Sequence, residues 1–320
     1  MKKRLHASAL LAILSVISTV ATAQWAPSKY VEIIANTGAG SGPDKTARLI
    51  QKLLQQNVLS VPASVVNKPN MGYIYLNQNP GSGNHLLVAS KAMLSNHIVG
   101  RSPVSYTDIT PVAHLFGEYI AVAVRSDSPI KNGKDLMDRL KSAPNAFSFG
   151  IANIIGNANH QAVASAQHQA GIDVGKTRNV VFKSGGDAIT ALLGGHVDVV
   201  PATVGSWISL IPTGKIRIIA VTSPRRLSGS LADVPTWKEM GYDVTVSNWR
   251  GLVAPKGLER AQIEYWNAAI RKMVETEEWK RELEQNHWVD EYMNSQEMYK
   301  YLKEDYAQTK SFLTSLGLAK

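Results

Sequence analysis

Three loops rich in glycine and small polar residues have the residue types that suit the binding of an anion. They cover 36–44 (Asn-Thr-Gly-Ala-Gly-Ser-Gly-Pro-Asp), 156–160 (Gly-Asn-Ala-Asn-His) and 183–187 (Lys-Ser-Gly-Gly-Asp). Glycine lets the backbone approach a ligand, and a helix that begins after such a loop presents unpaired N–H groups with a partial positive charge. We therefore expect these loops to bind a carboxylate or phosphate. For each side chain taken singly, helix capping or turn formation is the alternative role.

Short apolar runs precede these loops, and helical spacing follows them. Pro43 suits the first turn of a helix, because its missing N–H costs nothing there. The runs that we interpret as strands are 31–35, 64–66, 86–89, 120–124, 147–151, 180–182, 197–200, 216–221 and 251–255. The residues with helical spacing are Ala47, Ile50, Leu53 and Leu54; 159–169; Ile189, Leu192 and Leu193; Ile263, Trp266, Ile270 and Met273; and Met298, Leu302, Phe312 and Leu313.

The alternation of strands and helices occurs twice, and two helices close the chain. Such alternation is typical of a parallel sheet covered by helices. We therefore predict an α/β fold of two doubly wound lobes. Ligands of such sheets bind beyond the carboxyl ends of the strands, so the loops of both lobes are expected to line one shared cleft.

Catalytic and cofactor-binding motifs are incomplete in this sequence. The first loop has Pro43 where a dinucleotide-binding loop needs glycine, and Gly171 to Thr177 is one residue short of a phosphate-binding P-loop. There is no Gly-x-Ser-x-Gly elbow, no His-Glu-x-x-His pair and no cysteine. We expect no catalytic residue, no metal and no cofactor. A periplasmic enzyme that uses one of the aspartates or histidines is the remote alternative.

The N-terminus has the three parts of a secretory signal peptide. A basic start (Met1 to Arg4) is followed by an uncharged, mostly apolar stretch (7–20) and by Ala21-Thr22-Ala23. We expect cleavage after Ala23 and release into the periplasm without a lipid anchor, since no cysteine is present to carry a lipid. An N-terminal membrane helix is the alternative. Residues 24–320 are long enough for two lobes.

The charge of the chain favours an anionic ligand. Loss of the three basic residues of the signal peptide lowers the net charge from +9 to +6. Such an excess draws anions towards a cleft. The basic residues are scattered and form no stripe interleaved with aromatic residues, so no nucleic-acid partner is expected.

A series of motifs, in order along the chain, resembles the receptors of tripartite tricarboxylate transporters, also called Bug-type receptors. Each motif is weak alone, and the resemblance covers essentially the whole chain after residue 23. The motifs are Asp44 with Ala47-Arg48, 65–69 (Val-Val-Asn-Lys-Pro), Gly156-Asn157 with His160, 182–186, 193–198, 214–217 with 219–221, 234–236, and 249–255 (Trp-Arg-Gly-Leu-Val-Ala-Pro).

The resemblance implies a Venus-flytrap fold of the type II periplasmic binding proteins. Its two lobes would be 24–122 with 249–320, and 123–248, joined by strands that cross near 120–124 and 250–254. A small carboxylate would be held in the cleft by backbone N–H groups and small polar side chains. The ligand-binding residues implied, together with two suggested by the sequence around 70–73, are Thr37, Gly38, Ala39, Gly40, Ser41, Asn70, Tyr73, Ser90, Asn157, Ser184, Gly185, Gly186, Ala202 and Thr203.

The sequence departs from the family pattern after Asn67-Lys68-Pro69, where members usually continue with glycines. Asn70 tolerates a left-handed backbone and can keep the turn, whereas Met71, Tyr73 and Tyr75 add bulk. We hypothesise a pocket less polar than one for citrate, suited to an aromatic or short apolar carboxylate. The alternative is that the tyrosines pack under the loop.

The resemblance also implies a partner and an output. A monomeric receptor would close on its ligand and dock on the permease subunits of a membrane transporter. A receptor that activates a membrane sensor kinase is the alternative, and the sequence does not separate the two because both partners would contact the same closed surface.

Overall fold

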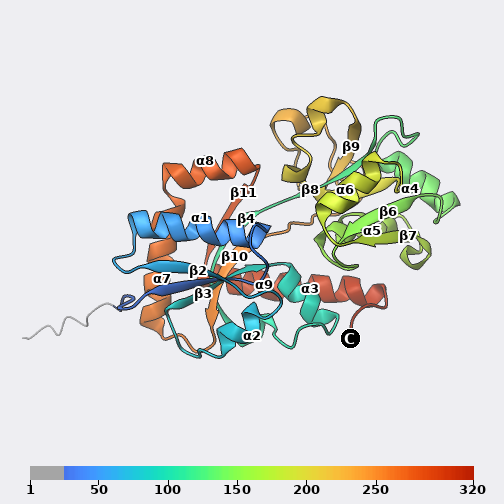
Figure 1. The fold of residues 1–320 in the computed structure, drawn as a ribbon. Helices are drawn as coiled ribbons and strands as arrows, with labels where there is room; N and C mark the ends of the chain where they lie inside the picture. Colours follow the sequence, from blue (N-terminus) through green and yellow to red (C-terminus); the bar gives the residue numbers. More distant parts are fainter. Residues whose placement is uncertain (1–24) are drawn as a thin grey trace, which may run out of the picture.

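The computed structural model describes residues 25–320, so the predicted signal peptide lies outside the described residues. Figure 1 shows two lobes side by side, each built on one sheet. The first sheet has the order β11-β4-β10-β3-β1-β2. Its strands are β1 (Val31–Ala35), β2 (Ala63–Asn67), β3 (His85–Ser90), β4 (Ile109–Gly117), β10 (Arg250–Pro255) and β11 (Val289–Asn294). The helices of this lobe are α1 (Gly42–Asn57), α2 (Gly72–Asn77), α3 (Ala92–Ile98), α7 (Arg260–Val274), α8 (Glu277–Asn286) and α9 (Ser295–Ser315).

The second sheet has the order β7-β6-β8-β5-β9. Its strands are β5 (Ile120–Arg125), β6 (Ser148–Ala152), β7 (Arg178–Phe182), β8 (Val199–Thr203) and β9 (Ile216–Val221). Its helices are α4 (Gly133–Ser142), α5 (Ala158–Gln169) and α6 (Gly185–Leu193). Short 3₁₀ turns occur at Tyr106–Asp108, Val174–Lys176, Val204–Ser206, Ile211–Thr213 and Gly229–Leu231. The predicted α/β fold of two lobes is confirmed.

The chain crosses between the lobes at two adjacent segments. β5 pairs on both sides with strands of the second sheet, and β10 pairs on both sides with strands of the first. The crossings therefore precede Ile120 and Arg250, where Tyr119 and Ser247 form an antiparallel bridge. The expected crossing strands at 120–124 and 250–254 are thus strands inside the two sheets. The lobe limits at 122 and 249 stay a prediction, and the pairing of β5 favours a first limit before Ile120.

Each sheet is buried on both faces, because successive residues of a strand point to opposite sides. In β1, Ile33 belongs to the apolar cluster under α1 and α7, whereas Ile34 belongs to the cluster on the opposite face of the sheet. In β5, Val122 and Ala123 divide in the same way between the two clusters of the second lobe. A continuous apolar run such as 120–124 is the sequence pattern that this double burial requires.

The last helix of the first lobe touches the second lobe. α9 extends beneath the second lobe in Figure 1. A Cβ built on Gly156, just before α5, would lie 2.9 Å from Cδ2 of Leu313 in α9. Within residues 25–320, no helix combines the length and the apolar character needed to cross a bilayer.

Candidate functional site

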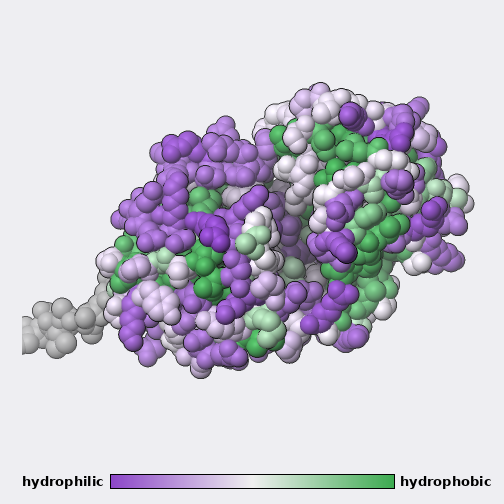
Figure 2. All heavy atoms as spheres, viewed as in Figure 1, coloured by the Kyte–Doolittle hydropathy of each residue, from purple (hydrophilic) through white to green (hydrophobic). Residues whose placement is uncertain are grey.

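The three loops that suit an anion lie on the sides of the two lobes that face each other. Ser90, at the end of β3, pairs with Arg250 at the second crossing, and β1 and β2 run parallel to β3. In the second lobe, Val204 follows β8 and donates to the Tyr119 carbonyl at the first crossing, while β6 runs parallel to both β8 and β7. The carboxyl ends of all six strands therefore face the other lobe. Figure 2 shows the molecule hollowed between the lobes.

The first loop is held by a buried carboxylate at the start of α1. Asp44 accepts hydrogen bonds from the Gly40 N–H (2.8 Å), from Nδ2 of Asn67 (2.9 Å) and from Nε of Arg48 (3.1 Å). Thr37 and Ser41 join their hydroxyls at 2.5 Å. Burial alone raises the pKa of the Asp44 carboxyl, but the bonds from Arg48, Gly40 and Asn67 outweigh it and lower the pKa to about 2. Asp44 thus stays ionised and fixes the backbone of 37–41.

The predicted polar side chains of the second and third loops cap their helices. Asn157 accepts from the His160 N–H at 3.0 Å and donates to the Ala152 carbonyl at 2.7 Å. Ser184 accepts from the Asp187 N–H at 3.2 Å. The capping role named as the alternative is therefore present for both. The groups left to meet a ligand are backbone N–H groups of the first helical turns.

The third loop leaves room for a ligand at the start of α6. A Cβ built on Gly185 would meet no atom within 4 Å, and one on Gly186 would meet only Oγ of Ser184, at 3.7 Å. The backbone at these two positions is therefore open to close approach.

The remaining predicted residues differ in how accessible they are to a ligand. Ser90 ends β3, and Thr203 ends β8 with its hydroxyl 3.0 Å from that of Ser206. Asn70 is exposed and has the left-handed backbone expected for it, with φ of 60°. Ala202 is buried in the apolar cluster of β8, so only its backbone is left for a ligand.

Tyr73 and Tyr75 do not extend into the opening as the hypothesis of a less polar pocket requires. Tyr73 is buried, burial raises its pKa, and its hydroxyl contacts the Ser90 backbone. Tyr75 contacts Glu32, and the Lys68 ammonium lies 4.3 Å from its ring centroid. The geometry favours the alternative, in which the tyrosines pack under the loop.

A buried ion pair at the crossings was missed by sequence reasoning. Arg250 is 8% exposed, and its Nη2 lies 3.1 Å from Oε2 of Glu118. Nη1 of Arg250 donates to the carbonyls of Asn248 (3.0 Å) and Trp249 (3.1 Å). The sequence did carry a signal, because each of the two apolar segments contains a single charged residue. Arg250 is the one in 249–255, and Glu118 is the one in 109–124 when histidine is counted as neutral.

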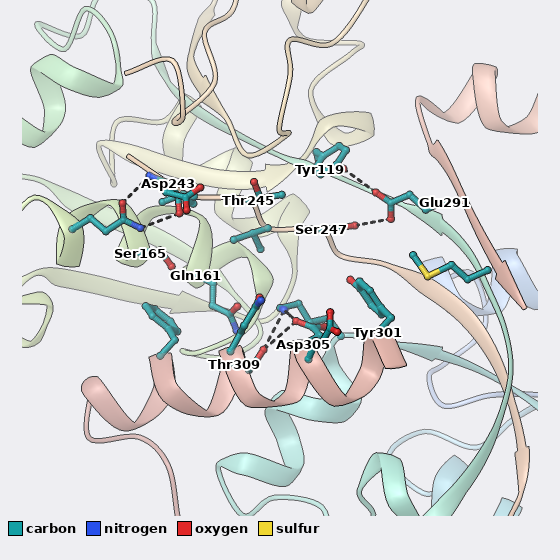
Figure 3. A pocket seen from close by; sticks show the side chains of 18 of the residues that line it. Tyr119, Gln161, Ser165, Asp243, Thr245, Ser247, Glu291, Tyr301, Asp305 and Thr309 are labelled. Carbon is teal, nitrogen blue, oxygen red and sulfur yellow. Dashed lines mark hydrogen bonds and ion pairs between the residues drawn. The ribbon is translucent and has the colours of Figure 1, made fainter. Parts of the chain in front are cut away.

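Two cavities between the lobes flank the crossings. One, of about 630 Å³, lies between α9, α5 and 243–247. Figure 3 shows it with Tyr119 and Ser247 turned to Glu291, and with Asp305 and Thr309 on α9 below. None of the predicted ligand-binding residues lines this cavity.

The other cavity between the lobes adjoins the start of α1. It measures about 590 Å³ and is lined by Gly42, Glu118 and Thr203 together with the end of α8. A third cavity, of about 430 Å³, lies in the first lobe beside Asn70 and Tyr73. Thr203, Asn70 and Tyr73 are therefore the predicted residues that line a cavity.

The buried histidines have no metal-binding arrangement around them. Among residues 25–320, no group of three or more His, Cys, Asp or Glu side chains is arranged to hold a metal ion. Burial lowers the pKa of His160 to about 4, and His160 accepts from the Gly156 N–H at 3.1 Å. This contact supports the second loop.

Comparisons with known proteins agree with the motif series. The model of the tripartite tricarboxylate transporter family receptor matches residues 46–318. A Cupriavidus necator protein, the UPF0065 protein in the gbd 5′ region, is 25% identical over 300 residues, which cover 92% of this chain and 89% of that one.

Solved structures show the same fold. A TctC solute binding protein from Polaromonas superposes with a TM-score of 0.78 at 24% identity, covering 91% of this chain and 99% of that one. The R. palustris protein Rpa4515 with adipate gives a TM-score of 0.76 at 20% identity, covering 92% and 99%. Because its two α/β lobes match these structures and the family model matches most of its length, the chain belongs to the tripartite tricarboxylate transporter receptor family.

Proposed function

We propose that this receptor captures a small carboxylate between its lobes in the periplasm and delivers it to the permease subunits of a tripartite transporter. The observation that carries the proposal is that the starts of α1, α5 and α6 all face the opening between the lobes. Three sets of unpaired N–H groups then converge on one ligand, and helix N-termini favour negative charge. The fold shared with a protein solved with adipate supports a carboxylate as the ligand.

Binding proceeds by capture and closure. The carboxylate first meets the N–H groups at the start of α1, because the first lobe presents an organised loop held by Asp44. The second lobe then closes by bending the crossings beside Tyr119 and Ser247, and the starts of α5 and α6 complete the contacts. A ligand that lacks the carboxylate leaves buried donors unpaired, which is the source of selectivity.

A charge placed at the start of α6 tests this arrangement. Gly185→Asp puts a carboxylate into open space at the opening and does not disturb packing. We expect the affinity for the carboxylate ligand to fall at least about tenfold, because like charges brought together cost free energy. Calorimetric titration measures the change.

The matched control for this variant is Gly185→Asn, which has nearly the same shape and no charge. Asp in the first turn of a helix favours the helix, so Gly185→Asp should keep the melting temperature of the ligand-free chain. Equal affinities of the Asp and Asn variants would contradict a ligand carboxylate at this helix start.

The output of the closed receptor is tested in cells. Uptake of the ligand is measured in a strain from which the receptor gene is deleted. Loss of uptake supports transport, whereas intact uptake with a lost transcriptional response to the ligand favours the sensor-kinase alternative. Recovery of the ligand chemically unchanged after incubation with the receptor supports a binding function over a catalytic one.

A further inference from the structure

A charge pair joins the two crossings at the base of the opening. Glu118 lies in the first crossing and Arg250 begins β10, directly after the second. Glu118 also accepts from Nε1 of Trp288 (3.0 Å) and, through its backbone carbonyl, from the Asn248 N–H (2.9 Å). A guanidinium that is 8% exposed requires a counter-charge, and Glu118 supplies it in this structure.

The guanidinium of Arg250 lies beside the start of α1. A Cβ built on Gly42 would be 3.4 Å from Nη2 of Arg250, so the absence of a side chain at Gly42 leaves the guanidinium next to the first N–H groups of the helix. Gly42 and Glu118 both line the cavity of about 590 Å³ between the lobes. A carboxylate bound at the start of α1 would therefore lie within reach of Arg250.

We propose that Arg250 is a specificity-determining residue that donates to the ligand carboxylate at the start of α1, and that Glu118 opposes this contact by competing for the same guanidinium. The inference rests on the proposed function and deepens it, because it assigns recognition of the negative charge of the ligand to one side chain. Arginine has five N–H donors and pairs with carboxylates through two parallel bonds. Glu118 occupies one side of the guanidinium.

The two members of the pair should have opposite effects on binding. Arg250→Gln removes the positive charge and the bidentate guanidinium and leaves the Glu118 carboxylate facing the ligand, so the affinity for carboxylates falls about ten- to one hundredfold. Glu118→Gln keeps the acceptor for Trp288 but removes the competing charge, so the affinity rises about two- to tenfold. A pair that only held the hinge together would shift both variants in the same direction.

The test uses the full exported chain and calorimetric titration with adipate, benzoate and citrate. Arg250→Lys keeps the charge without the planar fork, and we expect it to recover part of the lost affinity. Arg217→Gln is the matched control, because Arg217 in β9 also donates to two carbonyls, those of Ser128 and Ile130, away from the opening. It should alter stability and leave carboxylate affinity unchanged.

The outcomes separate this inference from the proposed function. Opposite shifts for Arg250→Gln and Glu118→Gln, with partial rescue by Arg250→Lys, support the inference. Shifts of the same sign, or an effect of Arg217→Gln equal to that of Arg250→Gln, overturn the inference while wild-type binding leaves the receptor function standing. A wild-type chain that binds none of the three, and no member of a wider panel that adds other dicarboxylates, acidic amino acids, nicotinate and phthalates, contradicts the proposed function and this inference with it.

Discussion

Replacing Lys91 with methionine should destabilise the protein by about 3–5 kcal/mol, because it leaves a buried carboxylate without its counter-charge. Lys91 follows β3 at the edge of the opening, and its side chain and that of Asp305 on α9 are each 8% exposed. Asp305 pairs with the Lys91 ammonium through Oδ1 and accepts from Nε1 of Trp249 at 2.8 Å. Denaturant unfolding of wild type and variant measures the loss.

Two further variants show whether the buried pair is the cause. Lys52→Met removes a lysine from an exposed pair with Glu278 and should destabilise the protein far less than Lys91→Met, because solvent screens an exposed pair. Lys91→Met combined with Asp305→Asn removes both charges, so it should be more stable than Lys91→Met alone. A double variant that is less stable than the single one would contradict the account.

Replacing Asp44 with asparagine should destabilise the protein by about 1.5–3 kcal/mol and weaken ligand binding as well. The carboxylate is 2% exposed and accepts from Gly40, Asn67 and Arg48, and an amide supplies only one acceptor oxygen for these donors. The backbone of 37–41 then loses its fixed geometry. Denaturant unfolding and ligand titration measure the two effects.

The pH dependence of stability tests whether the Asp44 carboxylate causes the stability loss expected for Asp44→Asn. Its pKa is about 2 in the folded chain, below the ordinary value of 3.8, so its contribution is complete above about pH 5 and is lost as the pH falls through 2. Asp44→Asn should flatten the stability curve in that window. Asp138→Asn, which removes an exposed carboxylate of α4, is the control and should change stability much less than Asp44→Asn. Equal losses for both variants would contradict the role of Asp44.

Several parts of the fold that the sequence predicts well are buried on both sides, although the buried strand β4 was missed because Thr110, Pro111 and His114 interrupt its apolar run. β1 and β5 are continuous apolar runs, and α7 and α9 carry apolar residues at helical spacing. β11 and α8 were missed because they are only partly covered. β11 is a half-buried edge strand, and α8 buries only Trp279 and Leu283, which leaves too few apolar residues to define a period.

The sequence predicted which loops form the candidate site. It predicted poorly what the side chains of the site contact. Glycine-rich loops before helices identify the starts of α1, α5 and α6, because local sequence determines where a helix begins. The burial of Tyr73 was not predictable from local sequence, because Tyr73 joins an apolar cluster with residues far along the chain such as Trp249 and Met298. The Arg250–Glu118 pair was missed because it joins two segments far apart in the chain. Local sequence patterns do not predict which distant segments come into contact.

The measurement that tests the receptor function most directly is the thermal shift of residues 24–320 with a carboxylate panel. The panel holds dicarboxylates, citrate, acidic amino acids, nicotinate, benzoates and phthalates, and the protein is first unfolded and refolded to remove any bound ligand. At ~1,000 times its dissociation constant, a ligand stabilises the folded state by about 4 kcal/mol, which raises the melting temperature by several degrees. We predict such a rise with one chemical class of carboxylate. A refolded, cooperatively melting protein that shows no shift with any member of the panel would contradict the account.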